Sequence, residues 1–276
     1  MGVSLDRARE FVLRSGGVLE RRLYASLFED ASPDGVVAAV LAYRNDDGGF
    51  GHGLEPDKLA SESQPLDVQI ALQRLHEAGA REPELGARAC DFLASVADER
   101  GFTPVVLPSV ARYPRANHWG DGEFPPTISP ACAIAGYLHE LGVGHAWLER
   151  VTPSVFEELE RTPPDDAHVV HDALVFAEHA PGGDTLFSIL ADALPRARYF
   201  RSDPIDETYG LPPLKFPRAW FDDSLFEAHL DRLESEQQAD GGWPITWQPP
   251  AEASVLAWRA IWTIEALRTL RAYGRL

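Results

Sequence analysis

Acidic side chains and a histidine are concentrated in one long polar stretch of the chain, between Arg44 and Leu66. Beyond a double-glycine turn, its ionisable residues are His52, Glu55, Asp57, Lys58 and Glu62. Closely spaced carboxyl groups can act as general acid and general base, or can hold a divalent cation through their oxygens. Because long polar connections inside compact domains are usually functional, we predict that Glu55 and Asp57 are catalytic and that His52 contacts the substrate.

The same acids could instead have a structural role. In that case Glu55 and Asp57 would cap the helix that begins at Pro65, or pair with Lys58 and with arginines elsewhere in the chain. Pro56 separates the two acids and restricts the backbone between them, which favours a defined role of either kind. The sequence therefore leaves both interpretations open.

Aromatic residues gather in the connection from residue 97 to residue 127, which is also rich in glycine and proline. We predict that Tyr113, His118 and Trp119 line a substrate cavity, together with Tyr209 from a later loop, because aromatic faces stabilise positive charge. The alternative is that these side chains only fill the core.

The sequence carries no recognised metal or cofactor motif. His52 and the neighbouring acids have the residue types of a zinc or iron site but not a recognised ligand spacing, and Cys90 and Cys132 form no C-x-x-C pair. His168 and His171 are three residues apart with no third ligand evident, and we interpret them as a surface or capping pair. No phosphate-binding loop, nucleophile elbow or dinucleotide motif appears, so we predict no metal and no cofactor.

The composition restricts the partners of the protein. Its 276 residues include 43 acidic and 25 basic side chains, for a formal charge of -18, and no basic cluster that could neutralise phosphates. We therefore expect no nucleic acid partner. Charges interrupt the N-terminus, and no apolar run approaches the length of a membrane span. We expect a cytoplasmic chain with reduced, buried thiols and no integral membrane segment, and the oligomeric state is left open.

Apolar residues recur at helical spacing along most of the chain, and no segment shows a convincing period of two. We predict an all-α fold of about eleven helices. The expected helical segments cover residues 5–14, 17–28, 33–44, 65–79, 82–96, 129–142, 153–161, 166–179, 184–198, 222–238 and 253–273. Residues 199–217 contain four prolines and are not expected to form a regular helix.

One turn occurs twice in the chain. Residues 47–50 read Asp-Gly-Gly-Phe and residues 240–243 read Asp-Gly-Gly-Trp, and the helix after each copy ends in two leucines and a glycine. A weaker third copy begins at Gly101. The glycines permit backbone angles that other residues resist, and the aromatic residue can fill the gap between successive helical hairpins. Copies near residues 33–79, 82–142 and 222–274 indicate an architecture of repeated hairpins.

The last copy resembles a known repeat. Gln237, Gly241 and Trp243 match the Q-x-x-x-G-x-W repeat of squalene-hopene cyclases and of the related protein prenyltransferase β subunits, and the first copy is similar with Arg44 and Phe50 at the outer positions. The resemblance implies an (α/α) toroid, in which an inner ring of helices surrounds a cavity and an outer ring packs around it. Residues 1–276 would form one such domain, of eleven to twelve helices. The chain also looks like actinobacterial members of this superfamily without an assigned reaction.

The resemblance also implies a chemistry. The cyclases protonate their substrate with the middle Asp of a D-x-D-D-T motif, and the nearest segment here is Pro204-Ile205-Asp206-Glu207-Thr208, which lacks the first acid. By alignment Asp206 would be the proton donor and Glu207 its supporting carboxylate, with a solvated or turn-capping role as the alternative. The predicted function is a terpene-cyclase-like isomerase or lyase that acts on a hydrophobic isoprenoid-type small molecule by acid-initiated cyclisation or isomerisation.

Two other functions are compatible with the sequence. Toroids of this kind also house carbohydrate-active enzymes with paired carboxylates, and a non-catalytic binding module is the second alternative. Convergence of Glu55, Asp57 and Asp206 on one cavity would favour an enzyme. A polar, open cleft would then favour a carbohydrate, and a closed apolar cavity would favour an isoprenoid.

Overall fold

Eleven α-helices and several short 3₁₀ turns form the fold in this computed structural model, which describes residues 2–276. The helices are α1 (Leu5–Ser15), α2 (Val18–Phe28), α3 (Asp34–Leu41), α4 (Pro65–Glu77), α5 (Pro83–Val96), α6 (Ile128–Glu140), α7 (Ala146–Arg161), α8 (Ala167–His179), α9 (Phe187–Ala193), α10 (Asp223–Ser235) and α11 (Glu252–Ala272). Residues 2–276 contain no β-strand, so the predicted all-α fold is confirmed. None of these helices combines the length and apolar character needed to cross a membrane.

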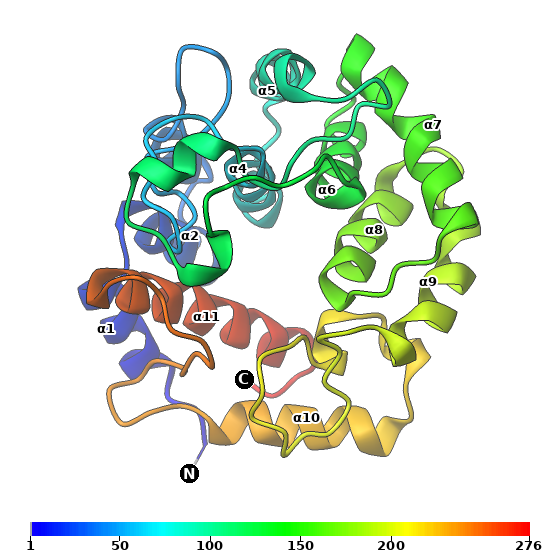
Figure 1. Cartoon of the computed structure of the whole chain (residues 1–276). Coiled ribbons are helices and arrows are strands. Elements are labelled where there is room, and N and C mark those ends of the chain that lie inside the picture. The colour runs from blue at the N-terminus through cyan, green and yellow to red at the C-terminus, as the bar shows by residue number, and fades with distance from the viewer. Residues whose placement is uncertain (1) are drawn as a thin grey trace.

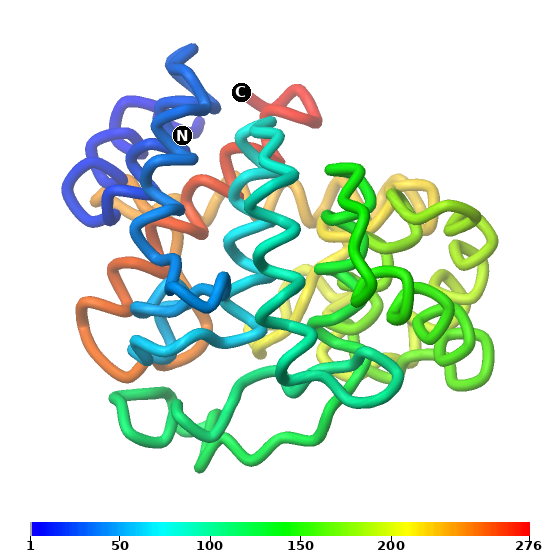
Figure 2. The backbone as a smooth tube through the Cα atoms, turned by 90° about the horizontal axis from the view of Figure 1, so that it is seen from above, coloured from blue at the N-terminus to red at the C-terminus, as the bar shows by residue number. Residues whose placement is uncertain are grey.

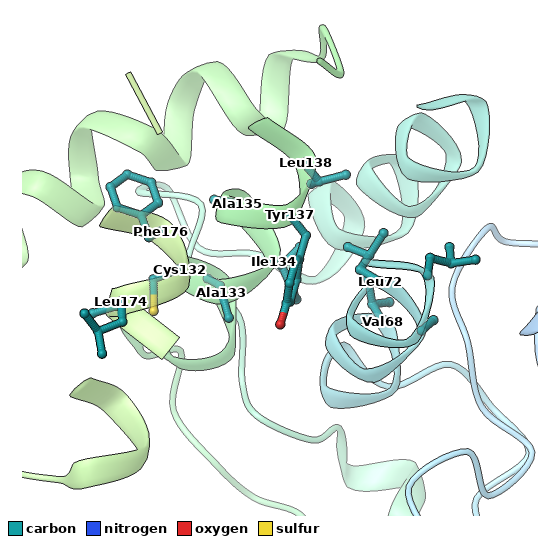
Figure 3. Packing of buried hydrophobic residues seen from close by; sticks show 14 of the residues in the cluster. Val68, Leu72, Cys132, Ala133, Ile134, Ala135, Tyr137, Leu138, Leu174 and Phe176 are labelled. Carbon is teal, nitrogen blue, oxygen red and sulfur yellow. The ribbon is translucent and has the colours of Figure 1, made fainter. Parts of the chain in front are cut away.

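The helices alternate between inner and outer positions around a ring (Figure 1). α4, α6, α8 and α11 face the middle, whereas α5, α7, α9 and α10 lie outside them. The small residues of α6 explain its inner position, because every residue from Pro130 to Leu138 is buried. A Cβ atom at Gly136 would lie 2.5 Å from the carbonyl oxygen of Val175, so this glycine lets α6 approach α8 closely. Figure 3 shows α6 between buried side chains of α4 and α8, among them Val68, Leu72, Leu174 and Phe176.

One inner position has no regular helix. Between α9 and α10 the proline-rich chain forms only short 3₁₀ turns, including Pro213–Lys215. Lys215 pairs with Glu265 on α11, and the ring of Phe216 packs edge-on against His171 on α8, with 6.3 Å between the ring centroids. This irregular segment therefore fills the inner position between α8 and α11.

The two copies of the turn have the same hydrogen bonds. The N–H of Asn45 donates to the carbonyl of Gly49, and the N–H of Gln238 donates to the carbonyl of Gly242, both at 2.9 Å. In each copy the aspartate two residues before the second glycine accepts from its N–H. Both turns end in a fully buried aromatic residue, Phe50 or Trp243. The repeat seen in the sequence is therefore a structural repeat.

The first glycine of each turn docks on a neighbouring helix. Gly48 has a φ of +88° and Gly241 a φ of +94°. A Cβ atom would lie 2.2 Å from the carbonyl oxygen of Arg88 on α5 in the first copy, and 2.1 Å from that of Arg7 on α1 in the last. Gly101, in the third copy, has a φ of +91° and lies against α7. Each turn thus packs its backbone on the next outer helix around the ring.

The last turn joins the two ends of the chain. The side chain of Gln237 accepts a hydrogen bond from the N–H of Ser4 at 2.8 Å. It also donates to the carbonyl of Ser4 at 2.9 Å and to that of Gly241 at 3.0 Å. The glutamine of the repeat motif therefore holds α1 against the turn that follows α10, and this contact closes the ring.

Most predicted helices agree with the observed ones to within three residues at each end, and two differ by more. The helix expected over residues 153–161 begins at Ala146 and runs through Pro153. Pro153 has no N–H for the carbonyl of Glu149, but Glu149 lies on the exposed face of α7, where water can take that bond. The helix expected over residues 184–198 is shorter, because 3₁₀ turns flank α9 on both sides.

Replacing Gly241 with alanine tests the docking of the last turn on α1. The new Cβ would meet a backbone carbonyl at a φ that L residues rarely adopt, so the free energy of unfolding should fall by at least about 2 kcal/mol. Gly144→Ala is the control, because no atom lies within 4 Å of its Cβ position, and it should change stability by less than about 0.5 kcal/mol. Urea denaturation measures both variants, and equal stabilities would contradict the docking.

Candidate functional site

The connections that lead from outer to inner helices gather at one end of the ring, which we call the loop end (Figure 2). Three of these connections are long and cover residues 42–64, 97–127 and 236–251; a fourth long loop, residues 197–222, leads from α9 through the irregular inner segment to α10. The catalytic and substrate-binding residues predicted from the sequence lie in three of these four loops. The ring therefore brings segments that are far apart in sequence to the same end of the molecule.

Three fully or almost fully buried ionisable residues, Glu55, Lys58 and Asp67, form a cluster at the loop end. The Lys58 ammonium lies 2.6 Å from Oδ1 of Asp67 and 3.6 Å from Oε2 of Glu55. Burial raises the pKa of both carboxyl groups, and Lys58 opposes the rise. One ammonium can balance one buried carboxylate, and Asp67 is the closer, so Glu55 keeps its proton. Its pKa is about 8.

The backbone fixes this cluster against the loop of residues 97–127. The N–H of Leu59 donates to the carbonyl of Pro114 at 3.0 Å, and the N–H of Ala116 donates to that of Asp57 at 2.7 Å. Within the cluster, the N–H of Glu55 donates to Asp67 at 2.9 Å. These bonds place His118, two residues after Ala116, beside the acids.

Asp57 is held by two indole groups. Trp247 donates to its Oδ2 at 3.1 Å and Trp258 donates to its Oδ1 at 2.9 Å. Nε2 of His118 lies 3.9 Å from Oδ2 of the same carboxylate. Burial raises the pKa of Asp57, while Trp258, His118 and Trp247 counteract the rise by stabilising the charged form. Because both oxygens of Asp57 accept indole N–H groups, we assign this side chain the charged form, beside the protonated Glu55.

Two side chains of the site reach solvent. His118 has 53% of its side chain exposed, and burial of the remainder lowers its pKa, against the effect of Asp57, so the imidazole is neutral at pH 7. Tyr209 is 46% exposed, and its ring packs edge-on against Trp247 with 5.8 Å between centroids. Burial raises the pKa of Tyr209 to about 12, so its hydroxyl remains a donor.

Tyr209 also ends a short hydrogen-bonded chain from α8. Its hydroxyl lies 2.9 Å from Nε2 of His168, and Nδ1 of His168 lies 3.1 Å from Oδ1 of Asp166. The same carboxylate caps α8 by accepting from the N–H of His168 at 2.9 Å. Asp166 and His168 therefore fix the position of the tyrosine hydroxyl.

The structure does not bring Asp206 and Glu207 into this cluster. Oδ1 of Asp206 accepts from the N–H of Thr208 at 2.8 Å, and hydrogen bonds from Thr208 lower the pKa of Asp206. The side chain of Glu207 is 86% exposed and lies 3.8 Å from Arg232. Asp206 therefore caps its own turn, which is the alternative role that we considered for this segment.

Three other predicted substrate contacts have local structural partners. His52 is exposed, and its Nε2 lies 2.9 Å from Oδ1 of Asn45. The hydroxyl of Tyr113 lies 2.7 Å from Oγ of Ser61. Trp119 packs in a small apolar cluster with Tyr113, Phe124, Ala60, Val106 and Val110. Of the predicted residues, Glu55, Asp57, His118 and Tyr209 are the ones that lie together.

Several partners of these residues carry no signal in the sequence. Asp67 has the position of an ordinary acid in the first turn of a helix, and Trp247 follows a proline-containing loop without a motif. Trp258 faces the site from α11, where helical spacing predicts only a buried stripe. The two indole bonds to Asp57 join residues 190 and 201 positions apart, which no local pattern reveals.

Charged and amide side chains are present on the inner helices beyond the site. Asp172 on α8 accepts from Gln69 at 2.7 Å and from Ser129 at 2.6 Å, and burial raises its pKa to about 6. Burial would raise the pKa of Glu265, but Lys215 and then Arg74 outweigh it and hold the value at about 2. Charged and amide groups thus occupy inner-helix faces where a lipid-binding cavity would have apolar side chains.

An open hollow of about 570 Å³ adjoins the site through Trp247. Its walls come from the loop before α11 and from α11 itself, and they include Gln238, Asp240, Pro244, Ile245, Gln248 and Arg259. This volume is within the range of small-molecule sites. Trp247 therefore contacts both the hollow and the buried carboxylate of Asp57.

Comparisons with known proteins identify the fold alone. No protein-family model matches the chain, and no curated protein matches it. The crystal structure of a protein from Actinoplanes is similar, with a TM-score of 0.57 and 14% sequence identity over 96% of this chain and 98% of that chain. At this identity the similarity supports a shared fold and carries no information about the site.

Glu55→Gln tests the neutral state of the buried acid. Between the ordinary pKa of 4.5 and the folded value of about 8, the folded state binds more protons at Glu55 than the unfolded state does. Stability should therefore fall as pH rises through this window, by up to about 1.4 kcal/mol per pH unit, and become level above it. The glutamine variant has no titrating group at this position. Its free energy of unfolding should therefore rise relative to that of the wild type between about pH 5 and pH 8.

Urea denaturation at several pH values measures this difference, with Glu62→Gln as the matched control. Although burial opposes it, hydrogen bonds from its own N–H and from Tyr113 lower the pKa of Glu62 below 4.5. The control should therefore run parallel to the wild type above about pH 5. A Glu55→Gln curve that is also parallel to the wild type would show that Glu55 is ionised.

Proposed function

We propose that the loop end is the active site of an acid–base enzyme that acts on a polar, polyhydroxylated small molecule of the carbohydrate class. One observation carries this proposal. The carboxylate of Asp57 is held by the N–H groups of Trp247 and Trp258, faces the exposed imidazole of His118, and lies beside the protonated Glu55. Because Glu55 is neutral, Asp57 carries the charge that can stabilise a protonated His118.

His118 is the proposed general base. It is neutral at pH 7 and exposed, so it can take a proton from a substrate hydroxyl or from water. The imidazolium that forms is then stabilised by Asp57, whose orientation the two indoles fix. Asp57 is thus a positioning residue that acts through His118.

Tyr209 is the proposed hydrogen-bond acceptor for a substrate hydroxyl. Nδ1 of His168 donates to the Asp166 carboxylate, so the protonated Tyr209 hydroxyl donates to Nε2 of His168, and its oxygen can accept from the substrate. Glu55 is too buried to touch a substrate. It acts by staying neutral, because a second carboxylate beside Asp57 would strengthen the charge on that side and raise the pKa of His118.

Aromatic and polar surfaces together favour a carbohydrate over an isoprenoid. The C–H faces of a sugar ring pack on aromatic rings such as those of Trp247 and Tyr209, while its hydroxyls bond to amides and carboxylates. The hollow beside Trp247 offers both kinds of surface. An isoprenoid would instead require an apolar cavity, and the inner helices carry Asp172, Glu265 and their partners. Acid-initiated isoprenoid chemistry remains a prediction from the sequence alone. The same is true of a non-catalytic binding function.

A substrate panel with matched variants tests the proposal. The wild type is incubated with aryl glycosides and with neutral and uronate-containing oligosaccharides, and products are measured by mass spectrometry. His118→Asn and Asp57→Asn should each lower kcat/KM for an active substrate by about 10²- to 10⁴-fold, because each removes part of the proton transfer. The control Asp206→Asn should remain within about twofold of the wild type, because its carboxylate only caps a turn.

The pH profile tests His118 as the base. kcat/KM should fall below the lowered pKa of His118. In Glu55→Gln this fall should keep its wild-type position, because Glu55 is already neutral at that pH. Carbohydrate binding without product would support the non-catalytic alternative, and turnover that survives His118→Asn would contradict the assignment of the base.

A further inference from the structure

A second group of ligand-type side chains lies away from the loop end, where the inner helices finish. His76 is in the last turn of α4, Glu140 is the last residue of α6 and His179 is the last residue of α8. Their potential ligand atoms all lie within 4.8 Å of one another. Among residues 2–276, this is the one such group of three His, Cys, Asp or Glu side chains.

The repeat explains why these residues meet. α4, α6 and α8 are each 13 residues long, and α6 packs against both of the others. Figure 3 shows these three inner helices in contact through their buried side chains. Equal length and shared orientation place the final turns at the same height, so each helix contributes one side chain from an equivalent position.

The distances are close to those of a metal site. Nδ1 of His76 lies 2.7 Å from Oε2 of Glu140, and Nε2 of His179 lies 4.0 Å from the same oxygen. Ligands of a tetrahedral Zn²⁺ ion with bonds of about 2.0–2.1 Å are separated by about 3.3 Å. The two measured separations lie on either side of this value, so side-chain movements of about 1 Å would suffice to enclose an ion.

The surroundings leave the three ligands accessible and oriented. Their side chains are 36% exposed for His76, 30% for Glu140 and 20% for His179, which leaves a path for an ion and room for a water ligand. The ring of Tyr137 packs against that of His76 with 5.3 Å between centroids. Arg81 donates to the backbone carbonyl of Glu140 at 2.9 Å, so this contact does not occupy the carboxylate.

We propose that His76, Glu140 and His179 form a Zn²⁺ site with three protein ligands and one position open to water. Two imidazoles and a carboxylate suit Zn²⁺, whereas Mg²⁺ and Ca²⁺ prefer oxygen ligands alone. The bound ion joins the ends of α4, α6 and α8. The site is separate from the loop end and does not depend on the function proposed for that end.

Metal titration of the tag-free, chelator-treated protein tests this site. Isothermal titration with Zn²⁺ alone should show one ion per chain. Glu140→Gln, His76→Ala and His179→Ala should each weaken binding by at least about 100-fold, since loss of an outer-shell partner alone costs 10- to 100-fold. Co²⁺ in the wild type should give the strong visible absorption of a four-coordinate ion, and this signal should be lost in Glu140→Gln.

His145→Asn is the matched control. His145 also faces a carboxylate, with Nε2 at 3.2 Å from Asp91, but it has no third ligand, and asparagine preserves its capping of α7. The control should bind Zn²⁺ like the wild type. Circular dichroism of the metal-free variants checks that each is folded. Absence of one-to-one binding in the wild type, or equal losses in His145→Asn and His179→Ala, would overturn the proposal.

Discussion

The docking of each glycine turn on the next outer helix sets the geometry of the whole ring. At Gly48 and Gly241 the backbone lies so close to a carbonyl of the neighbouring helix that no Cβ atom fits. The last of these contacts, strengthened by Gln237, joins the end of the chain to its beginning. A closed ring has two distinct ends, and all the connections from outer to inner helices are forced to the same one. The candidate active site is a consequence of that arrangement.

The charge states at the loop end follow from the burial of ionisable groups between the packed loops. Glu55, Lys58 and Asp67 are removed from water together, and the single ammonium can compensate only one of the two carboxyl groups. Glu55 therefore keeps its proton, while Asp57, which receives two indole N–H groups, carries the charge that His118 faces. At the opposite end of the ring, three inner helices of equal length finish side by side. Their last turns bring His76, Glu140 and His179 together.

Local patterns in the sequence were sufficient for the fold. Apolar spacing predicted the helices, four prolines predicted that residues 199–217 form no regular helix, and the duplicated glycine turn predicted the repeat. Pro153 was misread as a helix start, because its exposed position on α7 makes a proline tolerable in mid-helix. Only part of the candidate site could be predicted from the sequence. Glu55 and Asp57 stood out as acids in a long loop, but Trp247 and Trp258 reach Asp57 through tertiary contacts without a sequence signal. Asp206 matched a motif by residue type, yet it caps its own turn.

The central claim is that Glu55 is protonated at neutral pH beside an ionised Asp57. The most direct measurement is a ¹³C NMR titration of the labelled glutamate side-chain carboxyl groups, with the Glu55 signal assigned by its absence in a Glu55→Gln sample. We expect a titration midpoint of about pH 8 for this signal. A midpoint near the ordinary value of 4.5 would contradict it, because two carboxylates would then be ionised side by side at pH 7.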